Sequence, residues 1–287
     1  MAESRSTLPY DPRASLAPQG ATVARRLGRA TIRSHQRALG LLGTLGAAVA
    51  SMRTPGEAAR RSVRRILVVQ VLYTGVEALP LISAVALLLG ASIVFQTNLM
   101  VPGADSALIG KILVAVVLRE LAPLITAVVV SGRSGTAIAT ELGNMKVNAE
   151  IFALMSLGID PARFVIWPRL LATALSVMVL MIYFAVVALG GAFGVSVLMG
   201  EASLDGLRVG VASTVMTHDL GLFLAKGAGL GTIVGWLCCH FGLEVKSSPT
   251  EVPIMASRAV VTSLLGCVVY STLVTAGFYS LVGPPIR

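Results

Sequence analysis

Five apolar stretches, each long enough to cross a lipid bilayer as a helix, organise the sequence. Residues 78–104, 170–200 and 259–286 contain no charged side chain, whereas residues 108–130 and 220–243 are equally continuous but carry charge. A bilayer core requires about 20 apolar residues per helix, and a chain crosses lipid only as helices or as a closed barrel. Because none of the stretches alternates as a barrel strand does, the pattern predicts an all-α membrane protein with five transmembrane helices, at about residues 76–96, 108–130, 170–198, 220–243 and 259–282.

The segment before the first apolar stretch has a different pattern. Residues 1–24 hold three prolines between short polar runs, which predicts a disordered basic tail. From residue 25 to residue 52, leucine, isoleucine and valine recur at roughly helical spacing among arginines. This is typical of an amphipathic helix in the headgroup plane, and we expect an interfacial helix region over residues 25–65. The alternative is an ordinary positively charged flank of the first span.

Composition and charge narrow the class of protein. The chain of 287 residues is 55% hydrophobic and 13% charged, whereas a soluble domain carries about 25% charge. The net charge of +9 lies within residues 1–65, and the remainder sums to zero. Apart from Arg287, eighteen Lys and Arg lie on one side of the five spans and one on the other. This asymmetry predicts a cytoplasmic N-terminus and an external C-terminus, and it accounts for the basic arm without nucleic acid.

Two adjacent charges lie in the middle of the second span. Arg119 and Glu120 each cost at least ~2.5–3.5 kcal/mol at that depth. Adjacent helical residues diverge by about 100°, so partners must come from other spans or from a water-filled cavity. The pair is then either a structural ion-pair site or part of a polar pathway. Lys111 and Lys226 are expected to extend to the interface, and Asp219 is expected to be a helix N-terminal acid.

The connection between the second and third spans, residues 131–168, is also patterned. Its apolar residues recur at helical spacing, and Gly158 stands where the pattern ends. We expect one helix over about residues 136–157, after a tight exit from the membrane at Gly132 and Gly135. Such a helix either fills a groove on a partner or lies on the bilayer surface.

Motifs for catalysis are absent from the sequence. It has no G-x-x-x-x-G-K-[ST] phosphate loop, and the run Cys238-Cys239-His240 cannot close on one metal because consecutive helical residues diverge. We therefore expect no catalytic residue, metal site or cofactor in this chain, and three buried cysteine thiols.

Three segments of the sequence resemble a known family. The run LRELAPLITAVVVSGRSGTAIATELGNMKVNAEIFALMSLGIDPARFVIWPRLLA, residues 118–172, resembles the signature stretch of the MlaE (YrbE) permeases, the membrane subunits of MCE-type ABC transporters. The run VQVLYTGVEALPLI at residues 69–82 resembles the entry to their first span, and Met255–Val260 resembles the entry to the last. Residues 66–287 then correspond to the permease domain.

The resemblance implies a function and partners. Such permeases sit in the bacterial inner membrane as homodimers and bind two cytoplasmic ATPase subunits, which hold the ATP and Mg. They also meet a periplasmic ring of MCE-domain protein, and a small STAS-domain subunit often joins the ATPases. The substrate is a phospholipid or another hydrophobic molecule. The rival functions are an ion-coupled secondary transporter, which predicts internal repeats that five spans do not allow, and a non-transporting structural subunit.

The resemblance also assigns roles to residues. Those expected to line or gate the substrate cavity, part of it at the dimer interface, are Ile93, Gln96, Leu99, Met100, Val101, Arg119, Glu120 and Arg258. The 136–157 helix matches the coupling helix that docks in the ATPase, through Glu141, Met145, Lys146, Glu150, Ile151 and Leu154.

Overall fold

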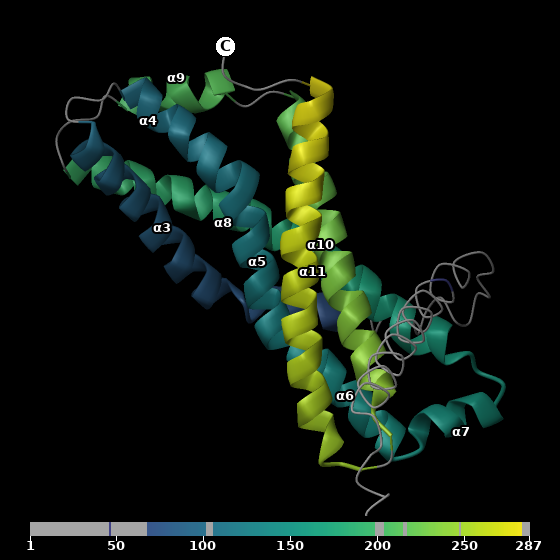
Figure 1. Ribbon diagram of the computed structural model, residues 1–287. Helices are drawn as coiled ribbons and strands as arrows, with labels where there is room; N and C mark the ends of the chain where they lie inside the picture. The colour runs from purple at the N-terminus through teal and green to yellow at the C-terminus, as the bar shows by residue number, and fades with distance from the viewer. Residues whose placement is uncertain are drawn as a thin grey trace, which may run out of the picture. The chain divides into compact units, whose positions relative to one another are not determined.

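A computed structural model describes residue 46 and residues 68–101, 106–198, 204–214, 217–246 and 248–282 (Figure 1). All regular structure in these ranges is helical, and five of the helices are long and apolar enough to cross a membrane. The predicted all-α class and the number of spans are therefore confirmed. The predicted disordered tail and nearly all of the predicted interfacial helix region lie outside the described residues.

The helices carry the labels of Figure 1, with π-helical segments written η. They are α3 (Leu79–Met100), α4 (Ser106–Leu113), η3 (Val114–Leu121), α5 (Ala122–Val130), η4 (Ser131–Gly135), α6 (Thr136–Val147), α7 (Glu150–Ser156), η5 (Ala162–Ile166), α8 (Trp167–Leu198), α9 (Leu204–Thr214), α10 (Thr217–Glu244) and α11 (Glu251–Val282). Residues 68–76 are also helical. The five candidate spans are Leu79–Met100, Ala107–Val147, Ala162–Leu198, Asp219–Glu244 and Glu251–Ser280.

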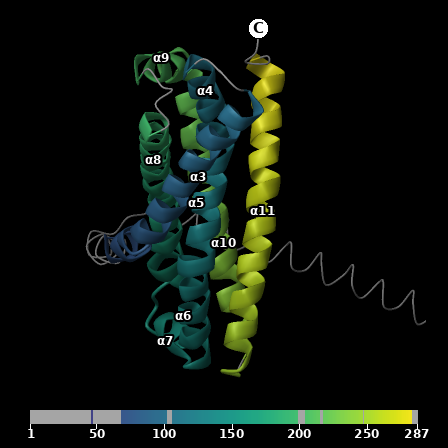
Figure 2. The same ribbon diagram turned by 90° about the vertical axis from the view of Figure 1, so that its left-hand side faces the viewer.

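The helices form one bundle with two distinct ends. Both views place α6 and α7 at one end and α4 and α9 at the other, with α11 running along the bundle between them (Figures 1 and 2). Helix α3 packs on α8, and α10 packs on both α8 and α11. A β-carbon at Gly191 would lie 2.7 Å from the carbonyl oxygen of Leu87, and one at Gly231 would lie 2.6 Å from Cα of Ala174. Glycine thus permits the close helix contacts that drive packing in lipid.

The second span does not leave the bundle where the glycines predicted an exit. Residues before and after η4 have helical dihedrals, so Ala107–Val147 is one continuous helical run. Gly135 serves packing, because a β-carbon there would lie 2.8 Å from Sγ of Cys238 on α10. The hydroxyls of Ser131 and Ser263 also meet at 2.5 Å, which joins η4 to α11. The expectation of a tight turn at Gly132 and Gly135 is therefore wrong, because the helix continues through both; that the chain leaves the membrane here stays a prediction.

The predicted single helix over residues 136–157 is also wrong, because the chain forms two helices there. Helix α6 ends at Val147, and Ala149, with φ of 59°, separates it from α7. A left-handed residue ends an α-helix, and the apolar spacing conceals the break because the pattern resumes beyond it. The predicted end at Gly158 is confirmed by its φ of 73°.

Candidate functional site

The backbone around Arg119 and Glu120 is shaped by a proline. Pro123 lies four residues after Arg119 and has no N–H, so the Arg119 carbonyl lacks its α-helical donor. The chain takes the wider π-helical path over η3, in which the Ala122 N–H donates to the Val117 carbonyl five residues back. The ammonium of Lys226, on α10, donates to the Arg119 carbonyl at 2.6 Å. A buried cation from another span thus replaces the missing backbone donor.

The Arg119 side chain is 8% exposed and has partners from two other helices. Its Nη2 lies 2.9 Å from Oδ2 of Asp219 on α10, and its Nη1 donates to the Tyr279 hydroxyl on α11 at 3.2 Å. Asp219 does lie in the first turn of α10, as an N-terminal acid would, but it also neutralises Arg119.

Glu120 is satisfied by the same two helices. Its Oε1 accepts from Lys226 Nζ and from the Thr275 hydroxyl, both at 2.8 Å, and Ser271 lies 3.5 Å from Oε2. Lys226 is fully buried, so the prediction that it extends to the interface is wrong. Lys226 lies near a span end, where a lysine commonly extends to the interface, whereas here its ammonium bonds the Glu120 carboxylate and the Arg119 carbonyl.

The two ion pairs are crossed in polarity. In one pair the cation, Arg119, lies on the second span and the anion, Asp219, on α10. In the other pair the anion, Glu120, lies on the second span and the cation, Lys226, on α10. Asp219 and Lys226 lie seven residues apart, which is about 10 Å along the helix axis. Sliding α10 by one turn would separate both pairs, and breaking a buried pair costs about 3–5 kcal/mol. The four charges therefore fix the register of the second and fourth spans. The expectation that Arg119 and Glu120 find partners on other spans is confirmed.

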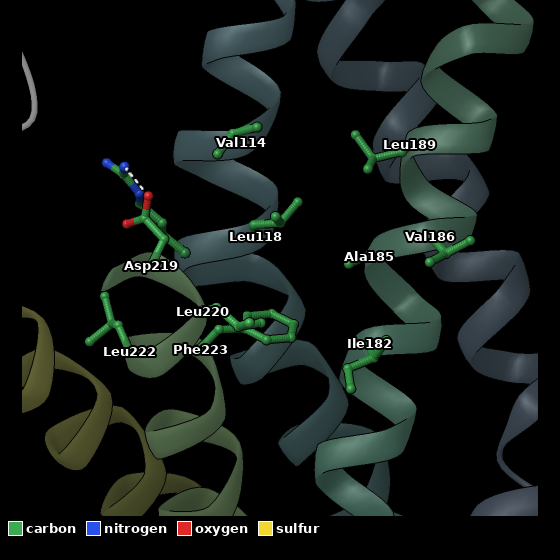
Figure 3. A pocket seen from close by; sticks show the side chains of 11 residues that line it. Val114, Leu118, Ile182, Ala185, Val186, Leu189, Asp219, Leu220, Leu222 and Phe223 are labelled. Atoms are coloured by element: carbon green, nitrogen blue, oxygen red, sulfur yellow. Dashed lines mark hydrogen bonds and ion pairs between the residues drawn. The ribbon is translucent and has the colours of Figure 1, made fainter. Parts of the chain in front are cut away.

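An apolar pocket of about 260 Å³ adjoins Arg119. In Figure 3, Leu118 and Phe223 face Ile182 and Val186 across it, and Asp219 lies at its edge. The walls come from η3, α8 and α10, all of which contribute aliphatic or aromatic side chains. Such a pocket can hold a hydrocarbon chain beside a neutralised ion pair.

The structure does not bring the other predicted cavity residues to this pocket. Ile93 is half-buried on α3, whereas the remaining predicted residues of that segment are exposed near its end, namely Gln96, Leu99, Met100 and Val101. Arg258 is exposed on α11, twenty-one residues before Tyr279, which is about 30 Å along the helix. None of these six lines the pocket beside Arg119. Their place in a cavity between two copies stays a prediction.

A second pocket lies at the α6–α7 end of the bundle and measures about 400 Å³. Three of the six predicted coupling residues, Glu141, Met145 and Glu150, line it together with Arg169. Arg169 is 6% exposed, and its Nη2 lies 2.6 Å from Oε1 of Glu141. Sequence reasoning missed Arg169, because its position at the start of the third span looked like an ordinary positive flank.

The remaining predicted coupling residues face inward. Lys146 Nζ donates to the Leu243 carbonyl and so secures the last turn of α10, while Ile151 and Leu154 are half-buried. The exposed apolar side chains of this end are Phe152, Met155 and Leu157, which are 68%, 54% and 74% exposed. Phe152 and Met155 are three residues apart, so they lie on the same side of a helix. This spacing could have predicted an exposed apolar face on α7 in addition to the inward one.

Comparison with known proteins decides the family. The family described as Permease MlaE matches residues 67–276, well over half of the chain. This chain belongs to the MlaE permease family. The intermembrane phospholipid transport system permease protein MlaE of Haemophilus influenzae is 28% identical over 202 residues, 70% of this chain and 77% of that protein.

Two further relatives of this MlaE family member match it over a smaller share of their length. A probable ABC transporter permease protein of Synechocystis sp. is 32% identical over 157 residues, 55% of this chain and 60% of its own length. The chloroplastic protein TRIGALACTOSYLDIACYLGLYCEROL 1 of Arabidopsis thaliana is 28% identical over 179 residues, 62% of this chain. The chain spans about half, 51%, of that plant protein. The matched region includes every helix of both pockets, so the geometry above belongs to the permease domain.

Proposed function

We propose that this chain is the permease subunit of an ABC transporter that moves a phospholipid or another hydrophobic molecule between the inner membrane and a periplasmic MCE protein. Energy comes from ATP hydrolysed in a partner subunit. Family membership supports the transporter class, and the name of the Haemophilus relative supports phospholipid as the substrate. The observation that carries the mechanism is the unbroken helical run Ala107–Val147, which contains Arg119 and also one wall of the α6–α7 pocket, at Glu141 and Met145.

The α6–α7 end is the proposed ATPase contact. Helix α7 lies outside the candidate spans, has no buried residue, and exposes Phe152 and Met155. Exposed apolar side chains on a short helix are typical anchors for a groove on a partner. Lys146 joins α6 to α10, and Glu141 joins it to Arg169 on α8. A displacement of α7 is thereby passed to three spans.

The other half of the mechanism concerns the lipid. The pocket beside Arg119 is lined mostly by apolar side chains, which suits it to an acyl chain. π-Helical turns interrupt an α-helix at functional sites, and η3 places one at this pocket. Motion along the second span would therefore change the pocket walls at Leu118 and Arg119. The exposed end of α3, including Leu99 and Met100, would complete a cavity with a second copy of the chain.

The proposed assembly follows the family. It contains two copies of this chain, two ATPase subunits and a periplasmic MCE ring, with a STAS-domain subunit as a further partner. The chain would sit in the inner membrane with its N-terminus in the cytoplasm and its C-terminus in the periplasm. The excess of Lys and Arg on the α6–α7 side supports this orientation.

The test is reconstitution of the purified complex in vesicles that contain fluorescent phospholipid, with MCE protein outside as the acceptor. We expect ATP to accelerate lipid movement, and a hydrolysis-deficient ATPase to abolish the acceleration. Mass spectrometry of the complex should find retained phospholipid. Lipid movement that follows an imposed ion gradient and ignores ATP would favour the secondary-transporter alternative, and no movement under either condition would favour a structural subunit.

A further inference from the structure

Arg169 is a buried cation that is only partly satisfied. It is 6% exposed, and its Nη2 is paired with Glu141. Its Nε and Nη1 are inaccessible to solvent and have no hydrogen-bond partner among the residues that the structure describes. A guanidinium offers five N–H donors, and buried donors are normally matched with acceptors. The bonding of Arg169 is therefore incomplete in this conformation.

The pocket wall beside Arg169 holds one unused carboxylate. The pocket of about 400 Å³ is lined by Arg169, Glu141 and Glu150, with Asn144 as the remaining polar residue. Glu150 is exposed, and its carboxylate makes no hydrogen bond or ion pair within the described part of the chain. Two carboxylates in the lining would repel an acidic group of a partner, and a basic group would leave Arg169 unsatisfied. Glu150 is thus the acceptor that the pocket itself supplies.

Glu150 is the first residue of a short helix whose inward side chains, Ile151 and Leu154, are only half-buried. Helix α7 has no buried residue, and it is joined to α6 through Ala149, a non-glycine residue in the left-handed region. Short elements with few buried contacts move at low free-energy cost, and strained dihedrals concentrate at switching segments. The helix that exposes Phe152 and Met155 therefore also carries a carboxylate that could accept hydrogen bonds from the unpaired N–H groups of Arg169.

We propose that α7 closes onto the pocket when the ATPase docks, so that Glu150 becomes the second carboxylate partner of Arg169. Arg169 is then a positioning residue: it holds α7 against the start of α8 in the docked state and releases it in the free permease. This inference rests on the proposed function, because docking of the ATPase supplies the force. It adds to that function the contact through which a docked α7 reaches the third span.

The test is a pair of double-mutant cycles. One uses E150Q, R169Q and the double variant, and the other uses E141Q in place of E150Q. In the isolated permease, the losses of thermal stability caused by E150Q and R169Q should be additive. Those caused by E141Q and R169Q should not be additive, because these two residues already form an ion pair. In the assembled complex, E150Q and R169Q should each reduce ATP-dependent lipid transfer at least fivefold. The E150Q/R169Q variant should lie within twofold of R169Q alone. N144A, which alters an uncharged residue of the same pocket, should stay within twofold of wild type.

Three outcomes would overturn the inference. The first is independent action of E150Q and R169Q in an active complex. The second is that R169Q abolishes ATPase co-purification while the effect of E150Q simply adds to it. In that case the ATPase, and not Glu150, would supply the hydrogen-bond acceptor for Arg169. The third is coupling already present in the isolated permease. If R169Q does not fold, the cycle is run with R169K, which keeps the charge but not the planar donor set. Absence of ATP-dependent transfer by the wild-type complex would overturn the proposed function together with this inference, whereas additivity in an active complex overturns only the inference.

Discussion

Replacing Lys226 by methionine should destabilise the bundle. Lys226 is fully buried, and its ammonium bonds Glu120 at 2.8 Å and the Arg119 carbonyl at 2.6 Å. Methionine fills similar volume but donates nothing, so Glu120 loses its counter-ion and the carbonyl beside Pro123 loses its donor.

The magnitude follows from those two losses. Breaking a buried ion pair costs about 3–5 kcal/mol, but the Glu120 side chain is 38% exposed and keeps the Thr275 hydroxyl, so we expect roughly half of that. An unsatisfied carbonyl adds about 1 kcal/mol within a membrane protein. The sum of about 3 kcal/mol corresponds to a fall of roughly 5 °C in Tm for a chain of 287 residues.

The assay is thermal unfolding of the detergent-solubilised permease, followed by intrinsic fluorescence. The matched control is Lys111→Met, because Lys111 is exposed on α4 and its loss should change stability by at most about 0.5 kcal/mol, or roughly 1 °C in Tm. The double variant K226M/E120Q removes the unpaired charge and should recover about half of the loss. The reasoning fails if K226M is no less stable than K111M, or if adding E120Q lowers Tm further.

Three other changes have definite expected outcomes. Asp219→Asn removes the negative charge that neutralises Arg119 and should lower stability by about 2 kcal/mol in the same assay; an unchanged Tm would contradict the pairing. Gly231→Leu should abolish the monodisperse peak in size-exclusion chromatography, because its β-carbon would lie 2.6 Å from Cα of Ala174 on α8, and a normal elution profile would show that the helices can part. Phe152→Ser should leave Tm within 2 °C yet weaken ATPase co-purification at least tenfold, and intact co-purification would remove α7 from the docking surface.

The spans were predictable from sequence because lipid imposes one rule along the whole length of a helix. Every backbone group must be bonded within the helix and every outward side chain must be apolar, so a long apolar run already specifies a span. No comparable rule marks where a helix stops once it leaves the hydrocarbon. Ala149 breaks the helix without a glycine or proline at the break, and Gly132 and Gly135 lie within a continuous helix. These local features depend on tertiary contacts, such as that of Gly135 with Cys238.

The candidate site was predictable in part. The energetic cost of Arg119 and Glu120 in lipid was sufficient to predict partners on other spans, but it could not identify them. Asp219 and Lys226 are separated from them by about one hundred residues, and each has an ordinary explanation at a span end. Arg169 was hidden in the same way. Pairings between distant segments depend on how the helices are aligned against one another, and a single sequence does not show that alignment.

The continuous second span sets a limit on how this chain can change in length. Ala107–Val147 comprises 41 residues, about 60 Å of helix, or twice the thickness of a bilayer core. It reaches from the crossed charges to the contacts of Glu141 and Lys146 with α8 and α10. One residue inserted between them would turn that far end by about 100° and move it 1.5 Å, which would separate both contacts together. Substitutions in this helix are therefore expected to be far better tolerated than insertions or deletions, and variation in length should occur in the connections between spans.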